Sequence, residues 1–121
     1  MQSKSKKILV VDDDPDIVEF LQELLELEGY SVASSYKSEY IEKLHASDLP
    51  DLILLDVLLS GKDGREIVKQ LKRREETRHI PVIMFSAHPT AEKTAREAGA
   101  DDFIAKPFEL DELVEIVARW V

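Results

Sequence analysis

Apolar positions along the chain follow two different spacings. Short continuous apolar runs occupy residues 8–11, 52–55 and 82–85, and such runs are typical of strands that are buried on both faces of a parallel sheet. Between these runs, apolar residues recur every three or four positions, as they do on the buried face of a helix. This alternation predicts a sheet in which each strand is followed by a helix.

Five pairs of a strand and a helix account for the chain. The strands are expected at residues 8–11, 30–33, 52–55, 82–85 and 103–105. Parallel strands joined by right-handed crossovers give a five-stranded, doubly wound α/β sheet, and they place every strand's carboxyl end at the same edge. We expect one domain over residues 7–121, preceded by a flexible flank at residues 1–6.

The helices are defined by their buried stripes and by their ends. The five stripes are expected to contain Leu21, Ile41, Val68, Ala95 and Leu113, in chain order. Asp14 is expected to cap the first helix ahead of Pro15, and Gly29 to end it. The charged run at residues 72–76 is expected to be a solvated end of the third helix. The fourth helix is rich in alanine, so we expect it to pack weakly.

Composition narrows the function. Of the 121 residues, 44% are hydrophobic and 34% are charged, and the formal net charge is −9. Such a charge repels phosphate backbones, so direct binding to nucleic acid is not expected. No apolar stretch approaches the roughly 20 residues of a membrane helix, and no cysteine is present for a disulfide or a thiolate metal site. We therefore expect a cytoplasmic protein with no membrane segment.

Polar side chains follow four of the expected strands. Asp12 and Asp13 come directly after the first strand, Asp56 after the third, Ser86 after the fourth and Lys106 after the fifth. Because these strand ends share one edge, we expect the side chains to lie together. Carboxylates are the hard oxygen ligands that Mg²⁺ prefers. A carboxylate can also accept a phosphoryl group when nearby cations neutralise the charge that develops during transfer.

These residues suggest a division of roles. Asp56 is the candidate acceptor, and Asp13, assisted by Asp12, is the candidate Mg²⁺ ligand. The backbone carbonyl of Leu58 is expected to complete the metal site. Lys106 is expected to pair with Asp56 before transfer and with a phosphoryl oxygen afterwards. A hydrogen bond from the Ser86 hydroxyl to another of those oxygens is also expected.

Four motifs in register resemble a known family. ILVVDDD, LILLDVLLSGKDG, VIMFSAH and GADDFIAKPF occur in this order. Over residues 7–121 the chain is similar to the receiver domain of response regulators in two-component signalling. The resemblance implies a flavodoxin-like, CheY-like single domain that works as a signalling switch and not as an enzyme.

The resemblance also implies how the switch operates. Asp56 would accept a phosphoryl group from a phosphohistidine on a sensor histidine kinase or a phosphotransfer protein, and Asp12 and Asp13 would hold Mg²⁺. The Ser86 hydroxyl would then move toward the phosphoryl group and the Phe103 ring would turn inward, reshaping the surface of the last strands and helices. The bond between Lys106 and the following proline is usually cis in such domains.

Partner surfaces follow from the same resemblance. The fourth helix, fifth strand and fifth helix are candidates for a homodimer or for contact with an output partner. Trp120 and Ile116 lie off the core stripe of the last helix and are candidate members of a partner surface. Ser60 stands where the family usually has a proline, and Leu58 and His88 occupy positions that commonly tune the phosphoryl lifetime.

Two other functions remain open at this stage. A small aspartate-nucleophile phosphohydrolase also carries an Asp-x-Asp pair after its first strand, and Asp12 and Asp14 have that spacing. A receiver-like docking module that never takes phosphate is the second alternative. Whether the chain acts alone, shuttles phosphate in a relay or belongs to a longer protein is also open.

Overall fold

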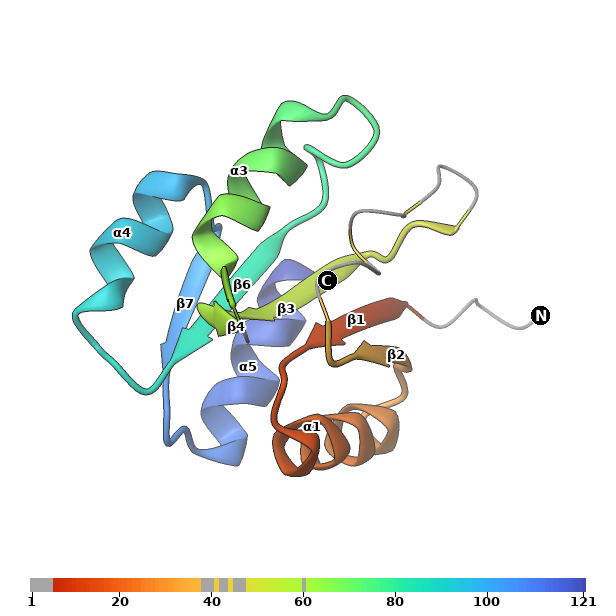
Figure 1. The fold of residues 1–121 in the computed structure, drawn as a ribbon. Coiled ribbons are helices and arrows are strands. Elements are labelled where there is room, and N and C mark those ends of the chain that lie inside the picture. The colour runs from red at the N-terminus through yellow and green to blue at the C-terminus, as the bar shows by residue number, and fades with distance from the viewer. Residues whose placement is uncertain (1–5, 38–40, 42–43, 45–47, 60) are drawn as a thin grey trace.

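The computed structural model describes residues 6–37, 41, 44, 48–59 and 61–121. Five parallel strands form one sheet in the order β2-β1-β3-β6-β7 (Figure 1). Their bounds are Lys7–Val11 for β1, Ser31–Ser35 for β2, Leu52–Asp56 for β3, Val82–Ser86 for β6 and Asp102–Ala105 for β7. The five predicted strands are therefore confirmed, with ends that differ by at most two residues.

Four helices are described, and they cover both faces of the sheet. Their bounds are Pro15–Leu27 for α1, Gly64–Arg73 for α3, Ala91–Ala98 for α4 and Leu110–Trp120 for α5. Most of the second predicted helix, and most of the predicted flank at residues 1–6, lie outside the described residues. Ile41 and Leu44, from the stripe of that predicted helix, are described and are buried.

The sheet has helices on both faces (Figure 1) and separates two apolar cores. Leu9 and Leu55 face one side, where they pack with residues of α3 and α4 such as Val68. Ile8 and Leu54 face the other side, where they pack with residues of α1 and α5. Because neighbouring residues of a strand point to opposite faces, one fully apolar run supplies both cores. Each described helix is too short or too polar to cross a membrane.

Local signals account for the start and end of α1. Asp14 Oδ1 accepts a hydrogen bond from the backbone N–H of Asp16 at 3.0 Å, and Pro15 occupies the first helical turn. Both features satisfy or avoid the unpaired N–H groups of a helix start. Gly29 follows the end of the helix with a φ of 96°, a conformation that suits glycine. The predicted cap and the predicted end are confirmed.

The charged end of α3 differs from the prediction. Lys72 is not simply solvated, because its Nζ lies 2.9 Å from Asp101 Oδ2 and 2.9 Å from the carbonyl oxygen of Ile80. Asp101 Oδ2 also accepts the backbone N–H of Val82 at 2.8 Å. The end of α3 passes over the amino-terminal edge of the sheet, and Lys72 ties the helix to the connections that precede β6 and β7.

Candidate functional site

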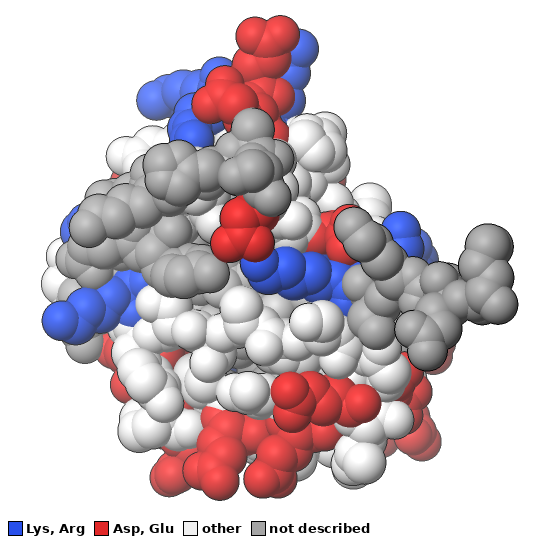
Figure 2. Space-filling model, turned by 90° about the vertical axis from the view of Figure 1, so that its right-hand side faces the viewer, with Lys and Arg blue, Asp and Glu red and all other residues white. Residues whose placement is uncertain are grey.

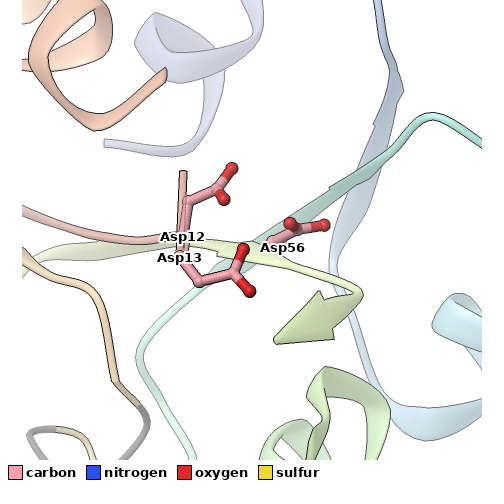
Figure 3. Close-up of side chains that lie close together, drawn as sticks. All are labelled: Asp12, Asp13 and Asp56. Atoms are coloured by element: carbon pink, nitrogen blue, oxygen red, sulfur yellow. The ribbon is translucent and has the colours of Figure 1, made fainter. Parts of the chain in front are cut away.

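The carboxyl ends of β1 and β3 bring three carboxylates together. Asp12 and Asp13 directly follow β1, and Asp56 is the last residue of the adjacent strand β3. One carboxylate oxygen of each residue lies within 4.8 Å of the others (Figure 3). Asp12 is fully buried, Asp56 is 8% exposed and Asp13 is exposed. The sheet topology therefore places the predicted acidic residues in one cluster at the sheet edge.

Lys106 supplies a cation to this cluster. Its Nζ lies 3.0 Å from Asp12 Oδ2 and 3.5 Å from Asp56 Oδ2. The expected pairing with Asp56 is present, but the shorter contact is with Asp12. Its backbone N–H donates to the carbonyl oxygen of Ser86 at 2.8 Å, which fixes the loop that follows β7. The bond between Lys106 and Pro107 is cis, as the family resemblance implies.

Burial and like charge act on the Asp56 carboxylate. Burial, followed by the negative charge of Asp12, raises the pKa of Asp56. The Lys106 charge and a hydrogen bond from the backbone N–H of Leu58 to Asp56 Oδ1 (3.3 Å) lower it, and the net result is a pKa of about 6. Ionised Asp56 is therefore held in an unfavourable environment that an added cation would relieve.

Ser86 and Phe103 lie near this edge but have different surroundings. Ser86 is 2% exposed, and its Oγ accepts the backbone N–H of His88 at 3.0 Å. It ends β6, where the preceding residue, Phe85, pairs with Asp56 across the sheet. Phe103 is 8% exposed and packs in the core beneath α3 and α4. Their switching roles remain predictions.

The donor set of the cluster fits a hard divalent cation. Three carboxylates supply oxygen ligands only, which is the chemistry that Mg²⁺ and Ca²⁺ prefer and that soft metals do not. Burial of Asp56 and the negative charge of Asp12, which together raise the pKa of Asp56, both favour a bound cation. The predicted contribution of the Leu58 carbonyl remains a prediction.

Comparison with known proteins decides the family. Residues 8–118 match the response regulator receiver domain family. The chain belongs to this family. It is 40% identical over 111 residues to PhoB, the phosphate regulon transcriptional regulatory protein of Pseudomonas aeruginosa. That alignment covers 90% of this chain and 48% of PhoB, so the receiver domain spans about half the length of this relative.

Solved structures show the same fold. The response regulator TrrA of Thermotoga maritima, in complex with Mg²⁺ and BeF, is 32% identical with a TM-score of 0.85; the match covers 96% of this chain and 99% of TrrA. The chemotaxis protein CheY4 of Vibrio cholerae is 23% identical with a TM-score of 0.88, covering 98% of this chain and all of CheY4. The receiver domain therefore has the CheY-like, flavodoxin-like fold.

Gly64 is a site residue that the sequence reasoning missed. Its backbone N–H donates to the carbonyl oxygen of Val57, the residue after Asp56, at 2.6 Å. A Cβ atom at this position would collide with the backbone carbonyl oxygen of Asp56. Glycine is therefore required for α3 to begin against β3. The signal in the sequence is the pair Asp63-Gly64, where Asp63 caps α3 through the backbone N–H of Arg65 (2.9 Å).

The loop after Asp56 forms a hairpin that was not predicted. Strands β4, Leu58–Leu59, and β5, Lys62–Asp63, pair in antiparallel orientation. Leu58 is 52% exposed at the start of this hairpin, and Ser60 lies outside the described residues. His88 is exposed after β6. The effect of Leu58 and His88 on phosphoryl lifetime remains a prediction.

Proposed function

We propose that this receiver domain, residues 7–121, is a phosphorylation switch and that Asp56 accepts the phosphoryl group. The observation that carries the proposal is the cluster of Asp12, Asp13 and Asp56, with the ammonium of Lys106 beside Asp12 and Asp56. The family supports a role in two-component signalling. The phosphoryl group is proposed to come from a phosphohistidine of a sensor histidine kinase or a phosphotransfer protein.

The proposed transfer is a displacement at phosphorus. A carboxylate oxygen of Asp56 forms the new P–O bond while the P–N bond to the donor histidine breaks, and the imidazole leaves with the bonding electrons and takes up a proton. Asp12, Asp13, Asp56 and the Leu58 carbonyl would hold Mg²⁺, whose charge would neutralise the phosphoryl oxygens. Lys106 already lies 3.5 Å from Asp56, so its ammonium can pair with one of those oxygens.

The response to phosphorylation is proposed to begin at Ser86. Its hydroxyl oxygen accepts the backbone N–H of His88, and the hydroxyl proton can be donated to a phosphoryl oxygen. Movement of Ser86 at the end of β6 changes the packing beside β7, where Phe103 lies in the core. Phe103 is already largely buried, and it has no hydroxyl. Its proposed contribution is therefore a repacking within the core.

The partner that delivers the phosphoryl group needs a docking surface beside Lys106. A groove of about 320 Å³ is lined there by Ile17, Phe20, Ala87, Lys106, Pro107 and Phe108. Its neighbour α1 exposes Asp16, Glu19, Glu23 and Glu26 and contains no basic residue. Figure 2 shows acidic side chains gathered along the lower edge of the molecule, where Figure 1 places α1. We propose that the donor presents a helix with an apolar centre and basic flanks to this groove.

The receiver domain is proposed to act in the cytoplasm and to pass its state to an output partner. PhoB, a transcriptional regulatory protein, is about twice as long as this chain. The output is therefore proposed to reside in a further domain or in a separate protein, with contact through α4, β7 and α5 or through a homodimer of that face. The net charge of −9 argues against direct contact of the receiver with nucleic acid.

Intact mass after incubation with Mg²⁺ and acetyl phosphate tests the proposal. We expect the gain of one phosphoryl group, and no gain in Asp56→Asn or in the presence of EDTA. Asp111→Asn, an exposed aspartate of α5, is the matched control and should be labelled normally. Labelling of Asp56→Asn would refute the acceptor assignment. Sustained turnover of a phosphomonoester would instead indicate a phosphohydrolase. That alternative needs Asp14 as the second member of an Asp-x-Asp pair, whereas Asp14 caps α1 in the structure.

The docking proposal has a separate test. Reversing the charge of Glu19 and Glu23 should slow labelling by a phosphorylated kinase or phosphotransfer protein and leave labelling by acetyl phosphate unchanged. Equal effects on both donors would show that the variant damages the acceptor site. An unchanged rate with the protein donor would refute the proposed role of α1.

A further inference from the structure

The carboxylate of Asp102 collects donors from three elements. Asp102 is 9% exposed and is the first residue of β7. Its Oδ1 accepts the guanidinium of Arg96 from α4 at 3.1 Å and the backbone N–H of Phe103 at 2.9 Å. Its Oδ2 accepts the indole N–H of Trp120 from α5 at 2.9 Å, and Arg119 Nη1 lies 3.7 Å away. These contacts satisfy a carboxylate that is almost out of reach of water.

The position of Asp102 connects the two helical layers. α4 packs on one face of the sheet and α5 packs on the other. β7 is the last strand of the sheet and pairs only with β6. Arg96 and Trp120 therefore reach around the edge of the sheet from opposite faces and meet at one carboxylate. A displacement of either helix must change a hydrogen bond of Asp102.

Asp102 directly precedes Phe103, the aromatic residue for which a switching role is proposed. The Phe103 side chain packs toward α3 and α4, whereas Ile104 packs toward α1 and α5. Side chains alternate along a strand, so Asp102 shares the side of Ile104 and faces α5. The N–H of Phe103 nevertheless donates to Asp102. A rotation of the peptide group at Phe103 therefore alters the same carboxylate that holds Trp120.

We propose that Arg96, Asp102 and Trp120 form a latch that couples the phosphorylation site to the last turn of α5. This inference rests on the proposed function, because it names the residues that carry the change from Phe103 to α5. Trp120 is a positioning residue here, since it acts through Asp102 and not on the phosphoryl group. Trp120 is the single tryptophan of the chain, so its fluorescence reports directly on the latch.

Thermodynamic linkage makes the coupling measurable from both ends. If phosphorylation changes the free energy of the latch, then breaking the latch must change the affinity of the site for a phosphoryl mimic by the same factor. Beryllofluoride with Mg²⁺ is a suitable probe, because it binds a carboxylate oxygen in place of a phosphoryl group. Trp120→Phe keeps an aromatic ring and removes the indole N–H, and Asp102→Asn removes the carboxylate charge.

The experiment combines fluorescence with calorimetry on the full chain. In the wild type, phosphorylation confirmed by intact mass should shift the emission of Trp120, and Ser86→Ala should be labelled without this shift. Trp120→Phe and Asp102→Asn should each change the dissociation constant of beryllofluoride by about fivefold or more, the lower end of typical coupling between sites. Tyr36→Phe, an exposed aromatic elsewhere, should leave it unchanged.

The possible outcomes separate the latch from the proposed function. Complete labelling without a change in Trp120 emission, or unchanged beryllofluoride affinity in both latch variants, would overturn the latch while leaving the acceptor assignment intact. Failure of labelling would overturn the acceptor assignment. In that case a double-mutant cycle between Phe103→Leu and Trp120→Phe still tests the latch, because it measures the coupling between the two residues in the free energy of urea unfolding. Additive effects of the two substitutions would refute the latch.

Discussion

Replacing Asp56 by asparagine should stabilise the metal-free protein. The raised pKa of Asp56, about 6 against an ordinary value of 3.8, means that ionisation is disfavoured in the folded state. Asparagine has nearly the same shape and carries no charge. The substitution therefore removes an electrostatic penalty at the cost of the proposed acceptor. The raised pKa already includes the attraction of Lys106. The stability gain worked from this pKa therefore already accounts for the loss of that attraction.

The magnitude follows from proton linkage. Below pH 3.8, Asp56 is protonated in both the folded and the unfolded state and contributes nothing. Between pH 3.8 and about 6 the folded state binds more protons, so its stability falls as the pH rises. Above about pH 6 the penalty is complete, and a difference of roughly two pKa units corresponds to about 3 kcal/mol.

Urea unfolding in EDTA measures this effect. At pH 8 we expect Asp56→Asn to be more stable than the wild type by about 3 kcal/mol, or roughly 10 °C in Tm. At pH 5 the advantage should fall to about half, because much of the wild-type carboxylate is then protonated in the folded state. Mg²⁺ should stabilise the wild type more than the variant, since it binds the charged carboxylate.

The matched control is Asp111→Asn. This exposed residue lies in the first turn of α5, where a negative charge is favourable, so its neutralisation should give no gain in stability. An Asp56→Asn variant that is no more stable than the wild type at pH 8 would refute the conclusion that the carboxylate is held at an energetic cost. A gain that does not depend on pH would show that packing, and not charge, is responsible.

Three further changes test separate parts of the structure. Gly64→Ala should cost about 1 to 3 kcal/mol in urea unfolding and slow labelling, because the new Cβ meets the Asp56 carbonyl; wild-type stability would contradict this reading. Lys106→Ala should still be labelled, although more slowly, when labelling is followed by intact mass. It should lack the change in tryptophan emission, and a normal emission change would show that Lys106 has no part in the switch. Lys72→Met should cost about 1 to 2 kcal/mol in urea unfolding, because it removes the cation from the half-buried Asp101 and the hydrogen bond to the Ile80 carbonyl. The exposed Lys69→Met should cost little, and equal costs would refute the tie.

The strands and the carboxylate cluster could be predicted because both depend on chain order. Fully apolar runs such as residues 52–55 can only be buried on both faces, and parallel strands end at a shared edge. Asp12 and Asp56 therefore had to lie close together once their strands were neighbours. The cap of α1 at Asp14 was equally local, since it depends on residues two positions apart.

Other features depend on the relative position of segments that are distant in the sequence. The contact of Lys72 with Asp101 joins residues 29 positions apart, and nothing near Lys72 in the sequence distinguishes it from a solvated lysine. The preference of Lys106 for Asp12 over Asp56 is a difference of 0.5 Å between two contacts, 3.0 and 3.5 Å. The need for glycine at Gly64 arises from the close approach of a helix start to the acceptor strand.

Asp56 and Asp102 show opposite uses of a buried carboxylate. Burial raises the pKa of both, but in Asp56 the charge of Asp12 adds to this effect. In Asp102, hydrogen bonds from Trp120, the Phe103 N–H and Arg96 outweigh burial and hold the pKa below its usual value. The charge of Asp56 is held at an energetic cost, so this site responds strongly when the charge is neutralised. The charge of Asp102 is stabilised by its hydrogen bonds, so a shift of their donors is proposed to carry a displacement from one element to the next. The two carboxylates lie on different strands of one sheet, Asp56 at the end of β3 and Asp102 at the start of β7.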